Sequence, residues 1–157
     1  MLKKILKGAA VVAPALIADR ITKVWAMGGM ETGEFIPGIV GFRYAENTGV
    51  AFSFMSGMPW LVNLMSAFLV IAITALLIAD KSFSRAARFG MWLIVAGGLG
   101  NLYDRLAYGY VVDFIEVLFM NFAIFNVADI CVCCGAFIAG AALIFLDIKD
   151  KKTTEGA

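Results

Sequence analysis

The sequence contains no histidine among its 157 residues. This absence excludes Ser-His-Asp and Cys-His nucleophile systems, and it excludes zinc sites that depend on imidazole ligands. Any hydrolytic chemistry must therefore depend on Asp, Glu, Lys, Ser or Cys side chains.

Cysteine is scarce as well, and its three residues stand close together in one apolar stretch: Cys131, Cys133 and Cys134. No distant cysteine is available to pair with them. We interpret all three as packing residues, since a buried cysteine behaves as a small hydrophobe.

Charge of either sign is sparse, with charged residues forming 16% of the chain against about 25% in an average soluble domain. Thirteen basic and twelve acidic residues leave a net charge of +1, so no basic excess indicates a nucleic acid partner. Hydrophobic residues instead make up 62% of the chain. This composition is typical of a membrane protein.

Four segments are long enough to cross a bilayer, which takes about 20 mainly apolar residues: roughly 5–27, 59–79, 86–105 and 123–146. We therefore predict an all-α membrane protein with four transmembrane helices in a single domain, residues 1–157. The first segment resembles a secretory signal, but its apolar pattern continues helically as far as Trp25. We predict that it is a retained helix.

Basic residues gather at three places: Lys3, Lys4 and Lys7 at the start, Lys81, Arg85 and Arg88 in the middle, and Lys149, Lys151 and Lys152 near the end. Arg43 is the only basic residue in the loop 28–58. Because Lys and Arg are enriched in short cytoplasmic flanks, we expect both termini in the cytoplasm. The loops 28–58 and 106–122 would then face outward.

The two outer loops differ from plain linkers. Within 28–58, Phe35-Ile36 and Val40–Tyr44 are typical of short strands, and Pro37-Gly38 is a turn signal between them. We therefore predict a small β-rich cap. The segment Phe114–Met120 is too short to span and too apolar for a free loop, so we expect a short interfacial segment there.

Polar residues from four separate parts of the chain map to one outward zone: Asp19, Lys23, Asn47, Asn101, Asp104, Arg105, Asp113, Asn126 and Asp129. A charge at the centre of a membrane helix costs at least about 2.5–3.5 kcal/mol, so each needs a partner or a function. Taken singly, an Asp–Lys pair can staple helices, and Asn126 is typical of a helix start. Packing alone does not require the whole group, which favours a functional site.

Asp113 and Asp129 stand at the two ends of the second outer turn. Because the chain leaves the membrane and returns between them, the two carboxylates can meet. Two carboxylates within hydrogen-bond reach share a proton and titrate as a pair. One can take a proton from water while the other protonates a carbonyl oxygen, as in aspartic proteases.

Five blocks of the sequence resemble the bacterial lipoprotein signal peptidases, also called type II signal peptidases, over nearly the whole chain. The blocks are Asp19-Arg20-Ile21-Thr22-Lys23, Asn47-Thr48-Gly49-Val50-Ala51-Phe52-Ser53, Gly97-Gly98-Leu99-Gly100-Asn101-Leu102-Tyr103-Asp104-Arg105, Val111-Val112-Asp113-Phe114-Ile115 and Phe125-Asn126-Val127-Ala128-Asp129. They occur in order on the predicted topology.

This resemblance implies an aspartyl endopeptidase that removes the signal peptide from diacylglyceryl-modified prolipoproteins at the outer face of the bacterial inner membrane. It implies that Asp113 and Asp129 are catalytic and that no metal or organic cofactor takes part. The substrate-binding residues would be Asn47, Gly49, Asn101, Arg105 and Asn126, and the supporting residues Asp19, Lys23 and Asp104. We expect the enzyme to be a monomer, with the two outer elements clamping the substrate from above.

Two other functions fit parts of the pattern. Membrane carboxylates paired with Lys or Arg also serve proton-coupled carriers, but carriers place their sites near the midplane, whereas Asp113 and Asp129 lie at one surface. A Ser–Lys peptidase would use Lys23 as the base for Ser53 or Ser56. Asp19, one turn away, favours a charged Lys23 and therefore argues against that base.

Overall fold

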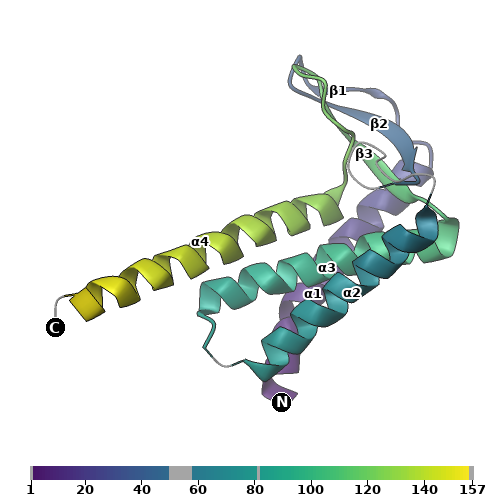
Figure 1. The fold of residues 1–157 in the computed structure, drawn as a ribbon. Coiled ribbons are helices and arrows are strands. Elements are labelled where there is room, and N and C mark those ends of the chain that lie inside the picture. The colour runs from purple at the N-terminus through teal and green to yellow at the C-terminus, as the bar shows by residue number, and fades with distance from the viewer. Residues whose placement is uncertain (1, 50–57, 81, 156–157) are drawn as a thin grey trace.

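The computed structural model describes residues 2–49, 58–80 and 82–155. Its elements, in chain order, are α1 (Leu2–Met27), β1 (Gly33–Ile36), β2 (Val40–Asn47), α2 (Pro59–Ala79), α3 (Arg85–Tyr108), β3 (Val111–Val117) and α4 (Val127–Glu155). Figure 1 shows the helices as one body with the small sheet beyond one end of it. The predicted mostly helical chain with a β-rich cap is confirmed.

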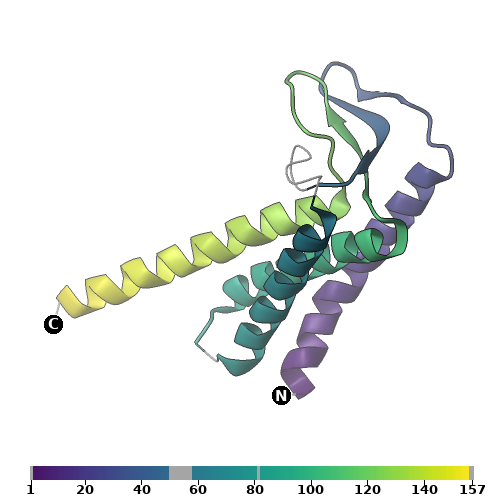
Figure 2. The ribbon, with the colours of Figure 1, turned by 45° about the vertical axis from the view of Figure 1, so that its right-hand side comes forward.

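Helix α3 is central to the helical body, since it packs against each of the other three helices. Helix α2 makes little contact with α4. Figures 1 and 2 show that the C-terminal half of α4 leans away from α1 and α2. One side of α3 is therefore left open between α2 and α4.

The ends of α3 follow from local chemistry. Ser84 precedes the helix, and its side chain accepts a hydrogen bond of 3.1 Å from the Ala87 N–H. Gly109 ends the helix with a positive φ of 84°, which glycine adopts without steric cost. The helix covers the predicted span 86–105 and extends three residues beyond it toward the outer turn, so Tyr108 still belongs to it.

Helix α4 begins later than the predicted span 123–146. Phe125 pairs with Ile115 in an isolated antiparallel bridge, with backbone hydrogen bonds of 2.8 and 3.0 Å. A residue that pairs with a strand cannot also be helical, so the helix starts at Val127. This late start leaves Asn126 beside the sheet.

The sheet has the order β1-β2-β3, and both pairs are antiparallel. Most of Phe114–Met120, where we expected a short interfacial segment, belongs to β3 and its continuing turn. An apolar run that alternates faces can satisfy its backbone groups by pairing with β2, which a segment lying alone in the interface cannot do. The strands β1 and β2 of the first loop and β3 of the second therefore form one cap.

The cap is attached to the C-terminal end of α1 by an apolar cluster. Ala26, Val112 and Phe114 are its buried members, and the Trp25 ring lies edge-on to the Phe114 ring at a centroid distance of 6.2 Å. This cluster holds β3 against the helical body. The strand can therefore present a side chain to the helices at a defined place.

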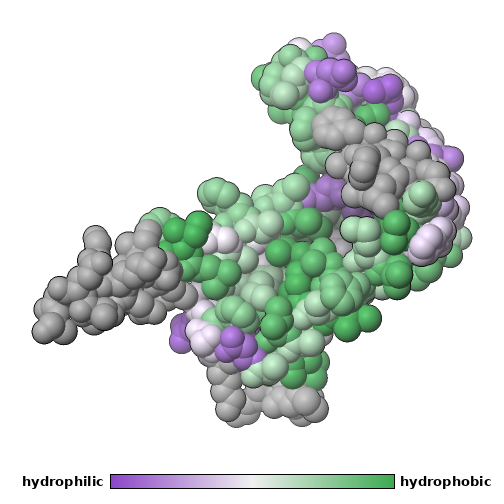
Figure 3. Space-filling model, viewed as in Figure 1, coloured by the Kyte–Doolittle hydropathy of each residue, from purple (hydrophilic) through white to green (hydrophobic). Residues whose placement is uncertain are grey.

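By length and composition, two of the described helices could cross a membrane: α2 and residues Val127–Phe145 of α4. In each, only 17% of an apolar 18-residue stretch is buried inside the protein. Figure 3 shows the helical surface as mostly hydrophobic, with hydrophilic groups at the outer part of the sheet and near the α2–α3 connection. The apolar groups of these helices face outward, as lipid contact requires.

Close packing of α3 on α4 depends on glycine. An added Cβ at Gly97 would collide with the Ala128 carbonyl oxygen, and one at Gly90 would lie 2.5 Å from the Gly135 carbonyl oxygen. The close approach of α3 and α4 therefore requires glycine at Gly97 and Gly90.

The substitution Gly97→Ala should lower the free energy of unfolding by about 1–3 kcal/mol, the usual cost of overpacking a close interface. Gly140→Ala on α4 is the matched control, because nothing lies within 4 Å of its added Cβ. It should leave stability unchanged or raise it by up to about 1 kcal/mol through helix propensity. Unfolding in denaturant, followed by circular dichroism in the same detergent, measures both; equal stabilities would contradict the prediction.

Candidate active site

Asp113 and Asp129 come together because β3 and the start of α4 are adjacent. Asp113 lies on β3, and two residues further along the strand Ile115 pairs with Phe125. Asn126 follows Phe125 and precedes α4, and Asp129 lies in the first turn of that helix. The antiparallel return of the chain therefore brings two carboxylates sixteen residues apart to one place.

Asn126 links the two aspartates and is completely buried. Its Oδ1 accepts from the Asp129 N–H at 3.0 Å, and the Asn126 N–H donates to Asp129 Oδ2 at 3.1 Å. This reciprocal pair has the form of a capping box at a helix N-terminus. The Asn126 Nδ2 donates to Asp113 Oδ1 at 2.6 Å. Asn126 thus caps α4 and also contacts the second carboxylate.

Asn101 on α3 holds the other oxygen of Asp129. Its Nδ2 donates to Asp129 Oδ1 at 2.8 Å, and its Oδ1 accepts from Lys23 Nζ at 2.9 Å. Asn101 Oδ1 also accepts from Asn126 Nδ2 at 3.2 Å. Both oxygens of Asp129 therefore accept hydrogen bonds from N–H donors.

Lys23 is fully buried and forms ion pairs with two carboxylates: Asp19 Oδ2 at 3.0 Å and Asp104 Oδ2 at 2.8 Å. Asp19 and Lys23 thus form the i,i+4 pair expected from their spacing. Asp19 Oδ1 also accepts from the Ala128 N–H at the start of α4, at 3.0 Å. A buried charge needs such partners, since an unpaired one is strongly destabilising.

Asp104 is likewise fully buried and joins three elements. Its Oδ1 forms an ion pair with Arg20 of α1, and its Oδ2 accepts from the Val112 N–H of β3 at 3.3 Å in addition to Lys23. Asp104 therefore fixes the first residues of β3 relative to α1.

Asn47 at the end of β2 holds Asp113 from the opposite side. Its Nδ2 donates to Asp113 Oδ2 at 3.0 Å, and its Oδ1 accepts from the Gly49 N–H at 3.0 Å. Arg105 donates to the Gly49 carbonyl oxygen at 2.8 Å through one terminal nitrogen. Within the described part of the chain, the buried Arg105 Nε has no hydrogen-bond partner.

A cavity of about 560 Å³ contains both aspartates. Its polar lining includes Asn47, Asn101 and Arg105, and its remaining lining comes from α2, α3, β3, α4 and the approach to α4. These apolar and weakly polar residues are Ser66, Leu69, Gly98, Val111, Phe122, Ala123, Ile124, Phe125, Ile130, Val132, Cys133 and Cys134. The cavity therefore joins a polar end to a long apolar wall.

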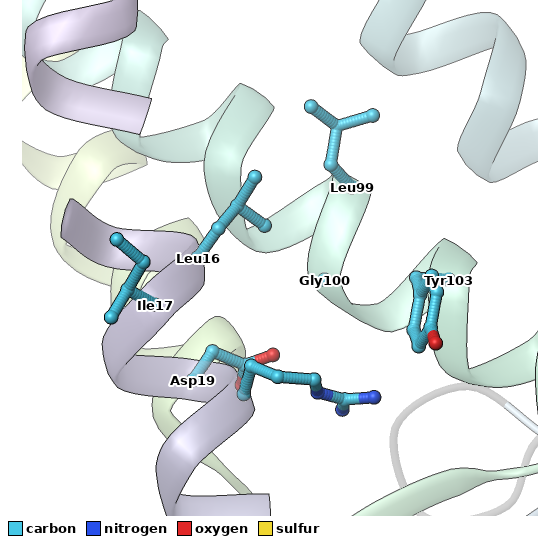
Figure 4. A pocket seen from close by; sticks show the side chains of 7 residues that line it. Leu16, Ile17, Asp19, Leu99, Gly100 and Tyr103 are labelled. Carbon is cyan, nitrogen blue, oxygen red and sulfur yellow. The ribbon is translucent and has the colours of Figure 1, made fainter. Parts of the chain in front are cut away.

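A second cavity of about 460 Å³ lies between α1 and α3, and the aspartates of the first cavity do not line it. Figure 4 shows Leu16, Ile17 and Asp19 on α1, with Leu99, Gly100 and Tyr103 on α3. A Cβ on Gly100 would lie 2.6 Å from Asp19 Oδ2. Glycine at this position therefore gives Asp19 the room to reach α4.

Burial, together with the negative charge of Asp129, raises the pKa of Asp113 from 3.8 to about 6. Hydrogen bonds from Asn47 and Asn126 favour the ionised form and oppose this increase without cancelling it. A raised pKa is the behaviour expected of one member of a close carboxylate pair. It allows Asp113 to hold a proton where an ordinary aspartate is ionised.

All ten residues that the sequence singled out lie in this connected network, from Asp19 on α1 to Asp129 on α4. Ser53 and Ser56, the nucleophiles of the Ser–Lys interpretation, lie outside the described residues. The sequence did not indicate that Ala128 N–H and Val112 N–H would bind carboxylates, because backbone groups carry no residue-specific signal.

The interpretation of the cysteines as buried packing residues was wrong for two of them. Cys133 and Cys134 are exposed and line the cavity, and Cys131 is half-buried. The side of α4 that carries them has little contact with α2, so packing does not cover it. An apolar helix can face lipid as readily as a core, which the sequence pattern does not distinguish.

The raised pKa of Asp113 predicts a pH dependence of stability. Between about pH 4 and pH 6 the folded protein binds more protons at Asp113 than the unfolded chain does, so stability falls as pH rises through this window. A tenfold difference in proton affinity between the two states corresponds to about 1.36 kcal/mol. From about pH 4 to about pH 6.5, the free energy of unfolding of the wild type should therefore fall by about 2–3 kcal/mol more than that of Asp113→Asn.

Denaturant unfolding at several pH values measures this difference. Glu31→Gln, which changes an exposed carboxylate in the outer loop, is the control and should follow the wild type. Parallel curves for the wild type and Asp113→Asn would contradict the assignment of this titration to Asp113.

Known proteins resemble this chain in sequence and in fold. The family model described as signal peptidase (SPase) II matches residues 11–145. The lipoprotein signal peptidase of Clostridium acetobutylicum is 36% identical over 148 residues, covering 90% of this chain and 94% of that protein. The lipoprotein signal peptidase of Streptococcus agalactiae is 42% identical over 114 residues, covering 71% of this chain and 74% of that protein.

Two solved structures, each described as a bacterial membrane enzyme, have the same fold. One has a TM-score of 0.82 and 27% identity, and covers 94% of this chain and 90% of its own. The other has a TM-score of 0.79 and 28% identity, and covers 87% of this chain and 92% of its own. Together with the family match over most of the chain, these findings show that the chain belongs to the signal peptidase II family of peptidases.

Proposed function

We propose that the chain is an aspartyl endopeptidase that removes the signal peptide from diacylglyceryl-modified prolipoproteins, cutting before the lipidated cysteine. The observation that carries this proposal is the meeting of Asp113 and Asp129 in one cavity, each held on both oxygens by N–H donors. The relatives named lipoprotein signal peptidase supply the substrate class.

The reaction uses the two carboxylates as a proton-exchanging pair. One carboxylate takes a proton from water, and the resulting hydroxide attacks the carbonyl carbon of the scissile amide. The other carboxyl group protonates the carbonyl oxygen, so the tetrahedral intermediate forms without a full charge on oxygen. Collapse of this intermediate breaks the C–N bond after a proton has moved to the leaving nitrogen.

Arg105 is placed to bind the substrate backbone. Its side chain lines the cavity, and its Nε–H has no partner within the described residues. An unsatisfied buried donor is costly unless a ligand completes it. A peptide carbonyl of the bound substrate would accept this hydrogen bond, while Arg105 keeps its contact with Gly49.

The apolar wall of the cavity fits the lipid part of the substrate. Leu69 on α2 and Ile130 on α4 lie on the wall, and α2 and α4 have little contact with each other. A substrate that stays in the bilayer can enter sideways between these helices. The diacylglyceryl chains would then lie along the wall while the scissile amide reaches the aspartates.

We place the chain in the bacterial inner membrane with four spans, both termini in the cytoplasm and the active site facing outward. The basic groups at the start, in the α2–α3 connection and near the end favour this orientation. The sheet then lies on the outer side, where it would cover the cavity as a single lid, and the enzyme acts as a monomer.

A Ser–Lys mechanism fits the site poorly. Lys23 is fully buried and donates to Asp19, Asp104 and Asn101. All three N–H donors of its side chain thus have acceptors, and none is left to contact a serine hydroxyl.

Asp113→Asn and Asp129→Asn should each reduce prolipoprotein processing by about 10²–10⁴-fold, the usual contribution of a general acid or base. Processing of a diacylglyceryl-modified prolipoprotein in vesicles, followed by gel shift, measures this loss. Asp80→Asn, at the C-terminal end of α2, should process normally. Full cleavage by either folded aspartate variant would rule out the two-carboxylate mechanism, and loss with Ser53→Ala instead would favour the Ser–Lys mechanism.

A further inference from the structure

Three asparagine side chains contact the aspartates, and two of them are oriented by backbone groups. The oxygen and nitrogen of an amide are told apart by their hydrogen-bond partners. Asn47 Oδ1 accepts from the Gly49 N–H, and Asn126 Oδ1 accepts from the Asp129 N–H. Backbone N–H groups only donate, so the Nδ2 of both amides must point toward Asp113.

Asn101 is the third asparagine, and its orientation depends on a side chain instead. Its Oδ1 accepts from Lys23 Nζ at 2.9 Å, and an ammonium only donates. The Nδ2 of Asn101 must therefore point to Asp129 Oδ1. If Lys23 were removed, Asn101 Oδ1 would still accept one described hydrogen bond, the longer one of 3.2 Å from Asn126 Nδ2. This bond alone would then hold the orientation of the Asn101 amide.

The two aspartates differ in their surroundings in a way that separates their roles. Asp129 lies in the first turn of α4, where the helix N-terminus favours negative charge. One of its oxygens accepts a backbone N–H and the other accepts Asn101 Nδ2. Asp113 lies on a strand, is 2% exposed and has no helix terminus of its own. Both carboxylates accept two N–H donors, so the helix N-terminus is the feature that distinguishes Asp129 from Asp113.

The charged groups around Asp113 and Asp129 carry one more negative than positive charge when all of them are ionised. From α1 come Asp19, Arg20 and Lys23, and from α3 come Asp104 and Arg105, with Asp113 on β3 and Asp129 on α4. Four carboxylates thus stand against three cations. One bound proton makes the cluster neutral, which a site of low dielectric constant favours.

We propose that Lys23, acting through Asn101, keeps Asp129 as the ionised member of the pair, and that Asp113 carries the single proton at rest. This inference rests on the proposed function for its role in catalysis. Asp129 would take the proton from water, so that hydroxide forms the new C–O bond, and the proton of Asp113 would move to the carbonyl oxygen. Lys23 touches neither water nor substrate in this scheme and is a positioning residue.

The test is a carbon NMR titration of enzyme labelled at the aspartate side-chain carboxyl carbon, without substrate, in detergent. Asp113→Asn and Asp129→Asn identify the two signals by their loss. In the wild type at about pH 5, the Asp113 signal should be at the protonated position and the Asp129 signal at the ionised position, because the pKa of Asp113 is raised to about 6. The reverse assignment, or an equal division of the proton, would overturn the proposal.

The role of Lys23 is tested by Lys23→Met against Arg20→Met. Each variant removes a cation of α1 that pairs with Asp104, but only Lys23 also contacts Asn101. Lys23→Met should move part of the proton to Asp129 and lower kcat about 10–100-fold, with KM changed less than about threefold. Arg20→Met should leave Asp129 at the ionised position, because the contacts of Asp129 with Asn101 and Asn126 stay intact.

An unchanged assignment in Lys23→Met would overturn the positioning role. If that variant does not fold, Asn101→Leu removes the amide while the Lys23 ion pairs remain, and it must show the same redistribution for the proposal to stand. Because the titration uses enzyme without substrate, it is independent of cleavage. Failure of wild-type enzyme to process prolipoprotein would contradict the proposed function and leave the proton assignment intact.

Discussion

The burial of the Lys23 ammonium among Asp19, Asp104 and Asn101 is the interaction on which the rest of the site depends. A buried charge costs several kcal/mol unless partners replace its water, and removing one partner typically costs about 3–5 kcal/mol. Lys23 has three partners from two helices. These partners in turn reach β3 through Val112 and α4 through Ala128. One cation thus fixes the relative positions of four elements around the aspartates, α1, α3, β3 and α4.

The cap contributes geometry as well as cover. β3 presents Asp113 inward because Val112 and Phe114, its neighbours, are anchored against α1. The bridge between Ile115 and Phe125 then determines where α4 begins. A shift of one residue in that pairing would turn side chains to the opposite face of the strand. The register of a small sheet therefore controls the distance between two groups that helices alone would not bring together.

The open side of α3 explains how a polar reaction site coexists with an apolar body. α2 and α4 leave a cavity whose walls are largely apolar, although its outer end contains carboxylates, amides and a guanidinium. Under the proposed function, such a cavity would admit lipid chains from the side of the bilayer. Water reaches the polar end from the outer face under the proposed orientation. A membrane-anchored substrate can therefore meet water without leaving the lipid phase.

Residue type and order along the chain were enough to predict the class of the protein, its long apolar segments and ten residues that the structure brings into one connected network. Hydropathy, charge position and residue type are local properties, so they can be read from one segment at a time. The strand pairing of Val111–Val117, the start of α4 at Val127 and the exposure of Cys133 and Cys134 emerged only from the folded arrangement. So did the orientation of Asn101 by Lys23, seventy-eight residues away. Each depends on which partner lies opposite in space, and periodicity along one segment carries no information about that partner.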